Sequence, residues 1–441
     1  MKKSLILTCA ALLLAAAPST ATAASAGGAY RTQHSGGAAL SAAFAIRPGE
    51  PAVGGVARVT LDGWTWRGAD PDAVTEQRVA PDAEFHVGSI SKAFLATVML
   101  QLAAEHRVDL DGTVQQYLPG VLPNTFQPIT IRELLNHTSG LPDVDAGAPP
   151  LTADQQIAGR LQYQTFDQII QQTLRPTDRP RPGPVFTPGT AQRYNSFAYR
   201  VAGRIIERVT GHSFAQEVTA RIVRPQGLAH TWVPQGDPFL PDPHLPAYLT
   251  DSAGTLAEVT EQGGDPSSMV STTGDLDRFL RALLGGELLP PAQQAELFTL
   301  PRDAAGRLLP SQDSNCASGP QKGLACFGAG LQKVTLADGT VIWGKTGHDL
   351  GYANGMFATQ DLRERLEYSV AETDGRTGAP PAPAYRLAVA AVGPLASPAQ
   401  QPGSAGLRVA VPAHQRGAAP GVLTVTDARG AGPAVASSTG S

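Results

Sequence analysis

Lysine and cysteine are scarce in this chain, and several catalytic patterns are missing from it. The 441 residues include 3 cysteines, and the formal net charge is −4. Lysine occurs only at positions 2, 3, 92, 322, 333 and 345. With no basic stripe and no run of like charge, we expect no nucleic-acid partner. His-Glu-x-x-His, a glycine-rich phosphate loop and a Gly-x-Ser-x-Gly elbow are also absent, so we expect no metal, no cofactor and no α/β-hydrolase fold.

Long apolar runs are confined to the N-terminus. Lys2 and Lys3 precede an apolar stretch at 5–17, and Ala21-Thr22-Ala23 supplies small residues for cleavage. This order is typical of a secretory signal peptide, so we expect residues 1–23 to be removed near Ala23 and the protein to be secreted. A membrane anchor is the alternative, but the stretch is shorter than the ~20 residues that cross a bilayer. No later segment is apolar enough, so we expect no stable membrane span.

Cleavage would leave two cysteines, Cys316 and Cys326. In an oxidising compartment an even pair predicts a disulfide. Closing so short a loop stabilises a protein by roughly 2–3 kcal/mol in the chain-entropy model. A two-cysteine metal site is the alternative, but it lacks nearby histidines, and the nearest, His348, belongs to a motif described below.

Strand patterns lie near both ends of the chain, with helical patterns between them. Residues 56–60 and 64–66 flank Asp62-Gly63, which predicts a hairpin. We expect further strands at 328–335, 341–345, 353–358 and 366–371, and helices from 89 and at 131–136, 166–174, 199–209, 276–284 and 384–392. An isolated hairpin is marginal in water, which disfavours two sequential domains. The predicted class is α/β (α+β): an antiparallel sheet built from N- and C-terminal segments, flanked by helices, with a mainly helical insertion.

The same order predicts the domain organisation. We expect one domain at 37–393, with its α/β part at about 37–112 and 251–393 and its helical part at about 113–250. Residues 394–441 are rich in Ala, Gly, Pro and Ser, which predicts a flexible tail. Oligomeric state is not readable from the sequence, and a monomer is the default expectation.

Ser89 and Lys92 form the most informative local pattern. They compose Ser-x-x-Lys at the start of an apolar segment, Ala93 to Ala104. Residues three apart share one face of a helix, so we expect the two side chains to lie together. A serine nucleophile needs a neighbouring base, and a lysine shielded from water can help supply one because its pKa falls. The alternative is a helix N-cap beside a solvated cation. The pair predicts a serine acyl-transfer enzyme without a histidine triad.

Two further motifs make the pattern specific. Tyr194-Asn195-Ser196 stands at the start of a predicted helix, and Lys345-Thr346-Gly347 lies at the end of a late strand. Together with Ser-x-x-Lys about a hundred residues before the tyrosine, they resemble the serine β-lactamase and penicillin-binding-protein superfamily. The likeness runs from about Val53 to Val392. It is greatest to the class C β-lactamase-like branch, and within it to the secreted Streptomyces-type D-alanyl-D-alanine carboxypeptidases.

The resemblance implies how the proton moves. Ser89 attacks a peptide or lactam carbonyl and becomes acylated, while Lys92 and Tyr194 together carry out the proton transfers. A free phenol has a pKa near 10. We therefore expect Lys92 and Lys345, two nearby cations, to help Tyr194 act as a base.

The resemblance also implies how substrate is held. Lys345 and Thr346 bind the substrate carboxylate, and the backbone N–H groups of Ser89 and His348 form the oxyanion hole. Gly347 leaves room for the substrate to approach the backbone.

Two motifs depart from the family's usual pattern. The family usually carries Tyr-x-Asn, whereas Asn195 directly follows Tyr194 here and Ser196 takes the asparagine position. We expect Ser196 to contact substrate, with a shorter reach than asparagine. Streptomyces-type carboxypeptidases usually have His-Thr-Gly where this chain has Lys345-Thr346-Gly347.

The sequence therefore predicts a secreted, penicillin-sensitive serine carboxypeptidase that removes terminal D-alanine from peptidoglycan stem peptides. Its expected partners are small molecules or peptides, namely D-Ala-D-Ala peptides and β-lactams. A class C-like β-lactamase or an esterase is an alternative, since these differ in deacylation rate and pocket shape. A catalytically silent peptide- or peptidoglycan-binding protein is a third, and the intact Ser89, Lys92, Tyr194 and Lys345 argue against it.

Overall fold

The structure is a computed structural model, and it describes residues 36–144, 146–316, 319–374 and 381–394. The predicted signal peptide at 1–23 lies outside these ranges, as does the predicted tail apart from residue 394.

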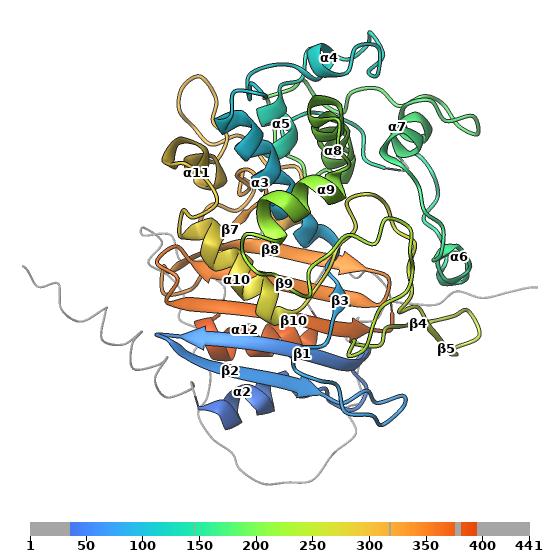
Figure 1. Cartoon of the computed structure of the whole chain (residues 1–441), viewed down its shortest axis with the longest axis vertical. Coiled ribbons are helices and arrows are strands. Elements are labelled where there is room, and N and C mark those ends of the chain that lie inside the picture. The colour runs from blue at the N-terminus through green and yellow to red at the C-terminus, as the bar shows by residue number, and fades with distance from the viewer. Residues whose placement is uncertain (1–35, 145, 317–318, 375–380, 395–441) are drawn as a thin grey trace, which may run out of the picture. The chain divides into compact units, whose positions relative to one another are not determined.

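A six-stranded antiparallel sheet, in the order β2-β1-β10-β9-β8-β7, carries the fold (Figure 1). Its strands are β1 (Ala52–Leu61), β2 (Trp64–Asp70), β7 (Gln332–Thr335), β8 (Val341–Asp349), β9 (Tyr352–Thr359) and β10 (Glu364–Glu372). Ala57 on β1 is paired with Tyr368 on β10, so strands from the two ends of the chain are direct neighbours. The predicted sheet built from N- and C-terminal segments is confirmed.

The turns explain where the strands end. Asp62 and Gly63, between β1 and β2, have φ angles of 47° and 86°, the left-handed pair that a two-residue hairpin requires. The strand predicted at 328–335 is shorter than expected. Gly330 has φ 77° there, which leaves only 332–335 extended. Strand β8, in contrast, continues four residues beyond its predicted end at 345, so the whole Lys-Thr-Gly motif lies within a strand.

Helices account for most of the remaining elements (Figure 1). They are α2 (Gly37–Phe44), α3 (Ser91–Ala104), α4 (Val114–Tyr117), α5 (Ile131–Leu135), α6 (Ala153–Gly159), α7 (Phe166–Leu174), α8 (Ser196–Thr210), α9 (Phe214–Val218), α10 (Thr273–Leu284), α11 (Pro291–Phe298) and α12 (Ala382–Val392). Short turns of other helix types are η1 (Gly88–Ile90), η2 (Thr219–Val223) and η3 (Ser314–Cys316). Two small sheets are β3 (Phe85–His86) with β6 (Val270–Ser271), and β4 (Tyr248–Thr250) with β5 (Leu256–Glu258). Each predicted helix is present; α7 has the predicted bounds, and each of the others is shifted by one to three residues at one or both ends.

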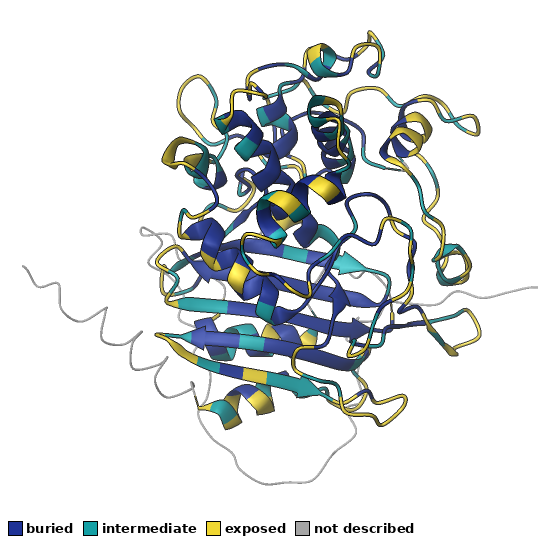
Figure 2. Ribbon diagram, viewed as in Figure 1, coloured by how far each residue is buried: buried dark blue, intermediate teal, exposed yellow. Residues whose placement is uncertain are grey.

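Apolar layers cover both faces of the sheet. Helices α2 and α12 close one face, where Phe44 and Leu387 join a core with Val370 of β10. On the other face the rings of Phe94 on α3 and Phe279 on α10 stack with centroids 3.6 Å apart. Figure 2 shows α3 buried along nearly its whole length, which explains why its apolar residues cover more than one stripe.

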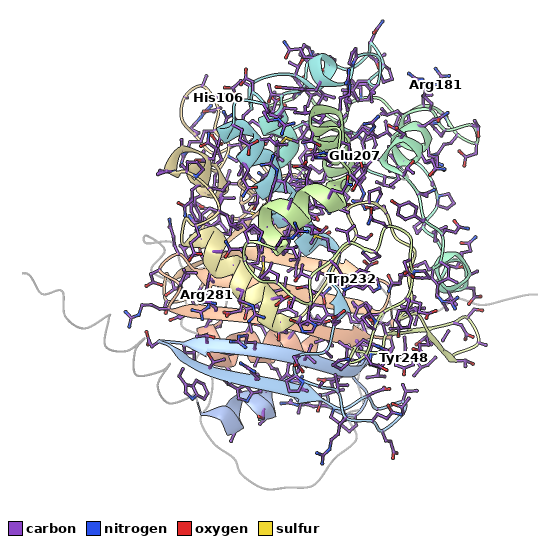
Figure 3. All side chains as sticks on the ribbon, in the orientation of Figure 1. His106, Arg181, Glu207, Trp232, Tyr248 and Arg281 are labelled. Atoms are coloured by element: carbon purple, nitrogen blue, oxygen red, sulfur yellow. A yellow bond between two sulfur atoms is a disulfide. The ribbon has the colours of Figure 1, made fainter. Side chains whose placement is uncertain are left out.

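The segment between α3 and β6 carries α4 to α9. Beyond the sheet, α4, α5 and α7 pack around α8, which in turn packs against α3 (Figure 1). Tyr248, which is labelled in Figure 3, lies on β4. Its hydroxyl donates to Asp72 at 2.9 Å and so ties the end of this segment back to the loop after β2. Within the described ranges, no helix combines the length and the hydropathy needed to cross a bilayer.

Candidate active site

Ser89 and Lys92 meet at the entrance to α3. Ser89 lies in the η1 turn, and the α-helix proper begins at Ser91, so the helix predicted from Ser89 starts two residues later. The Lys92 Nζ donates to the Ser89 Oγ at 2.9 Å. Burial lowers the pKa of Lys92 well below its usual value, and the charges of Arg200 and Lys345 lower it further. A lower pKa makes the Lys92 amine better suited to take the proton of the neighbouring serine hydroxyl.

Strand β8 passes directly beside η1, backbone against backbone. A Cβ added to Gly88, which has φ 53°, would lie 2.2 Å from the carbonyl oxygen of His348. A Cβ added to Gly347 would lie 2.0 Å from the carbonyl oxygen of Val87. Only glycine fits at either position, and this contact brings the backbone of Ser89 next to the backbone of His348. The predicted oxyanion hole would take its two N–H donors from these neighbouring backbones.

Tyr194 is held in place from several sides. Its backbone N–H donates to Asp313 at 2.6 Å, and its ring packs against His137, with centroids 4.6 Å apart. The Nζ atoms of Lys345 and Lys92 lie 4.6 and 5.3 Å from the centroid of the ring. His137 is itself buried, and its Nδ1 accepts a hydrogen bond from the Asn195 N–H at 3.1 Å, so it acts here as a packing residue.

The Tyr194 hydroxyl is buried and makes no hydrogen bond of ordinary geometry with the described residues. Burial raises its pKa to about 12, although the nearby Ser89 hydroxyl and the Arg200 charge oppose that shift. In the free site burial therefore outweighs the charge of Arg200, and the expected help of Lys92 and Lys345 in making this phenol a base stays a prediction. Tyr194 is protonated at neutral pH and is placed to donate a proton.

Asn195 and Ser196 separate into different roles. Asn195 caps α8, because its Oδ1 accepts from the Ala198 N–H at 2.6 Å, and its Nδ2 donates to the carbonyls of Leu141 and Pro142 at 2.8 and 3.0 Å. These contacts use its amide for structure. Ser196 instead lines the same pocket as Ser89, Lys92 and Tyr194. The exchange of the two residue types leaves a short hydroxyl where the resemblance implies an amide.

Lys345 and its neighbours form another wall of this pocket. Lys345 is buried on β8, and its Nζ donates to the carbonyl oxygen of Thr346 at 2.8 Å. Burial lowers the pKa of Lys345 to about 7, and the charge of Asp313 acts in the opposite direction. Thr346 and His348 line the pocket beside it. The structure thus brings every sequence-predicted site residue into one region.

Three charged residues at the pocket were not predicted from the sequence: Arg200, Asp143 and Asp265. Arg200 donates to Asp265 at 2.6 Å and to the carbonyl oxygen of Ser196 at 3.2 Å. Asp143 accepts from the first N–H groups of α8, at Ser196 (3.1 Å) and Phe197 (3.3 Å). One signal was available, since Arg200 lies four residues after Ser196, and that spacing places both on one helical face.

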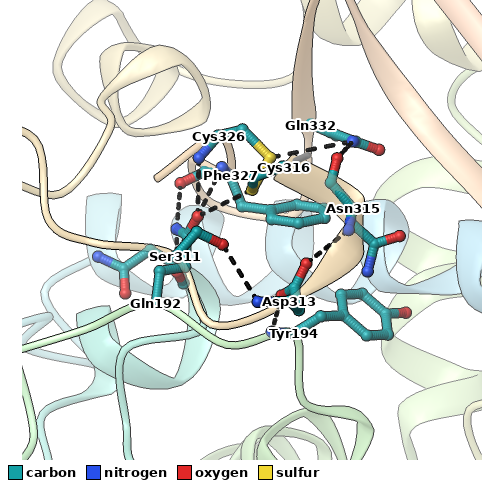
Figure 4. Close-up of a disulfide and its surroundings, with 10 residues drawn as sticks. Gln192, Tyr194, Ser311, Asp313, Asn315, Cys316, Cys326, Phe327 and Gln332 are labelled. Carbon is teal, nitrogen blue, oxygen red and sulfur yellow. Dashed lines mark hydrogen bonds between the residues drawn. A yellow bond between two sulfur atoms is a disulfide. The ribbon is translucent and has the colours of Figure 1, made fainter. Parts of the chain in front are cut away.

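The predicted disulfide between Cys316 and Cys326 is formed and borders the site (Figure 4). Buried Gln192 braces it, because its Oε1 accepts from the Cys326 and Phe327 N–H groups at 2.8 and 3.1 Å. Ser314 and Asn315, directly before the first cysteine, line the pocket. The disulfide therefore stabilises one rim of the site. Among the described residues, no cluster of three or more His, Cys, Asp or Glu side chains could hold a metal ion.

Comparison with known proteins agrees with this fold and site. The family model for beta-lactamases matches residues 41–392. Penicillin-binding protein 4* of Bacillus subtilis (strain 168) is 26% identical over 241 residues, which are 51% of this chain and 51% of that protein. Esterase EstB of Burkholderia gladioli is 29% identical over 227 residues, 46% of this chain and 56% of the esterase. The chain thus spans about half the length of the curated relatives it matches.

A crystal structure of a D-stereospecific amidohydrolase from Streptomyces sp. is similar over more of the chain. It has a TM-score of 0.66 and 28% identity, and the match covers 82% of this chain and 98% of that one. Fold and comparisons define a serine hydrolase of the β-lactamase fold, similar to a penicillin-binding protein, an esterase and a D-stereospecific amidohydrolase. The chain belongs to the beta-lactamase family, as its motifs predicted.

Proposed function

We propose that this protein is a secreted serine carboxypeptidase that forms an acyl-enzyme at Ser89 and releases the C-terminal residue of D-alanyl-D-alanine peptides. The observation that carries the proposal is the 2.9 Å contact between the Lys92 amine and the Ser89 hydroxyl. Around it stand a protonated Tyr194 and a second buried lysine, Lys345. Penicillins would acylate the same serine. Secretion is supported by the disulfide, which persists in oxidising compartments.

Acylation starts at the Ser89–Lys92 pair. The Ser89 Oγ attacks the carbonyl carbon of the scissile bond as its proton passes to Lys92 Nζ. This amine is suited to the task because burial lowers its pKa. The negative charge that develops on the carbonyl oxygen is taken by the N–H groups of Ser89 and His348. Losing one such donor typically costs roughly 3 kcal/mol of transition-state stabilisation.

Tyr194 then completes the proton path. When the carbon–nitrogen bond breaks, the leaving amine takes a proton from the Tyr194 hydroxyl, and the proton on Lys92 restores the phenol. Water cleaves the ester by the reverse path and frees Ser89. Lys345, with Thr346, holds the carboxylate of the leaving residue. A lysine with a pKa of about 7 does so best below that pH.

A second candidate is the hydrolysis of D-amino acid amides. The similarity to the Streptomyces D-stereospecific amidohydrolase, which extends over 98% of that chain, favours it. The carboxylate of Asp143 at the pocket is also suited to a substrate that carries a free ammonium group.

The test measures D-alanine released from diacetyl-L-Lys-D-Ala-D-Ala and ammonia released from D-phenylalanine amide, with Ser89→Ala as the control. We expect D-alanine release that is absent from the variant, together with covalent labelling of Ser89 by a fluorescent penicillin. Ammonia release without D-alanine release would replace the first function by the second. Absence of labelling and of both products would refute both.

A further inference from the structure

Arg200 is a charged residue in the wall of the site, and the proposed mechanism does not use it. It lies on α8, one turn after Ser196, and lines the same pocket as Ser89 and Tyr194. Its partner Asp265 is itself fixed, because the Asp265 Oδ1 accepts from the Ser267 N–H at 2.8 Å and from its hydroxyl at 2.5 Å. The guanidinium therefore has a defined position in the pocket wall.

The hydrogen-bonding capacity of Arg200 is only partly used. A guanidinium has five N–H groups. The bonds to Asp265 and to the Ser196 carbonyl use two of them, and the Nε is buried without a partner among the described residues. Its side chain is 21% exposed. Buried polar groups with a purely structural role are normally satisfied, so the unpartnered Nε and the exposed part of the guanidinium leave donors that a ligand in the pocket can use.

Arg200 and Lys345 come from different elements of the pocket wall, since Arg200 lies on α8 and Lys345 on β8. In the proposed function Lys345 binds the leaving residue. Arg200, which donates to the carbonyl oxygen of Ser196 at the start of α8, is then available to the acyl part of the substrate, the part that stays on Ser89.

The net charge around Arg200 determines whether a charged or an uncharged oxygen of a ligand can bind there. Asp265 neutralises Arg200, and Asp143 adds a second carboxylate at the same pocket. An anionic ligand would be repelled there, whereas an uncharged carbonyl oxygen can accept from the guanidinium without that penalty. The Ser196 hydroxyl, one turn earlier, is short and leaves this contact to the longer side chain.

We propose that Arg200 is a specificity-determining residue, and that it donates a hydrogen bond to the carbonyl oxygen of an N-acyl group on the acyl part of the substrate. This inference rests on the proposed function, which places the leaving residue at Lys345 and the acyl part of the substrate towards Arg200. It predicts that the enzyme selects N-acylated D-residues over otherwise identical acyl donors without the N-acyl group.

Two esters that differ only in this group test the idea: the p-nitrophenyl ester of N-acetyl-D-alanine and p-nitrophenyl propionate. In Arg200→Ala we expect the ratio of their kcat/KM values to fall by roughly 10–100-fold, the cost of losing a hydrogen bond to a charged donor. If the loss of Arg200 changes the pKa of Lys92, the hydrolysis of both esters changes by the same factor, and that factor cancels in the ratio. Arg204→Ala is the matched control, since Arg204 lies one turn further along α8 and pairs with Asp167 at 2.7 Å.

Arg200→Lys is a second variant for the case that Arg200→Ala does not fold. It keeps a cation beside Asp265, but lysine lacks the planar guanidinium group. We expect it to show the same substrate-dependent loss, to a smaller extent. An unchanged ratio in folded Arg200→Ala, or an equal fall in Arg204→Ala, would overturn the inference. Failure of the proposed function is distinguishable from this result, because it would show as absence of D-alanine release from the peptide while both esters are still hydrolysed.

Discussion

The close contact between β8 and η1 leads to a quantitative prediction for Gly347→Ala. The new Cβ would lie 2.0 Å from the carbonyl oxygen of Val87, whereas Cβ atoms essentially never come within 3.0 Å of such a neighbour. Strand and turn must therefore separate by about 1 Å at this point, and a misplacement of about 1 Å in a catalytic site can cost roughly 100-fold in rate. Since the separation acts on the backbones of Ser89 and His348, we expect kcat to fall by roughly 100–1,000-fold, as for the loss of an oxyanion donor.

The assay is single-turnover acylation by a fluorescent penicillin, together with turnover of p-nitrophenyl propionate. Thermal unfolding measured in parallel shows whether the variant is folded, since overpacking costs roughly 1–3 kcal/mol. Gly274→Ala is the control, because a Cβ there would meet only an ordinary contact of 3.7 Å with Thr272. A folded Gly347→Ala protein with nearly unchanged acylation would refute the reasoning that this backbone contact positions the oxyanion site.

Three further predictions concern charge and stability. The first compares kcat/KM for a D-Ala-D-Ala peptide with kcat/KM for the same peptide as its C-terminal amide. The ratio of the two values should fall above about pH 7, because Lys345 (pKa about 7) loses the charge that binds a carboxylate. A ratio that stays constant from pH 6 to 9 would contradict this. Gln192→Ala should lower the free energy of unfolding in urea by roughly 2–4 kcal/mol by leaving buried backbone groups unpaired, while exposed Gln171→Ala should change it little. Replacing Cys316 and Cys326 together by alanine should cost roughly 2–3 kcal/mol in the same measurement, and equal stability would show that the loop needs no cross-link.

The sequence predicted the parts of the fold that depend on local chemistry. The hairpin at Asp62-Gly63 followed from residues that tolerate left-handed backbone, and α7 was placed at 166–174 as observed. The limits of β8 were missed because its extension to Asp349 depends on pairing with β9, up to Asp349 opposite Tyr352. Such pairing is a tertiary effect that no local pattern carries.

The candidate site shows the same division. The i, i+3 spacing placed Ser89 beside Lys92, and the late motif supplied Lys345. The protonation of Tyr194 could not be predicted, because it depends on how far burial outweighs neighbouring charge, and burial is a property of the packed chain. Arg200 and Asp265 were missed for a related reason, since their pairing joins residues 65 positions apart.

The pairing of β1 with β10 also sets a time order for folding. The first hairpin leaves the ribosome early, but its partner strand follows roughly 300 residues later, which at ~5–20 residues per second is a delay of about 15–60 s. During that time the inner edge of β1 is open to any other unpaired strand. A chain that stops before Glu364 never closes this edge, so the protein cannot complete its sheet until nearly all of its described residues have been made.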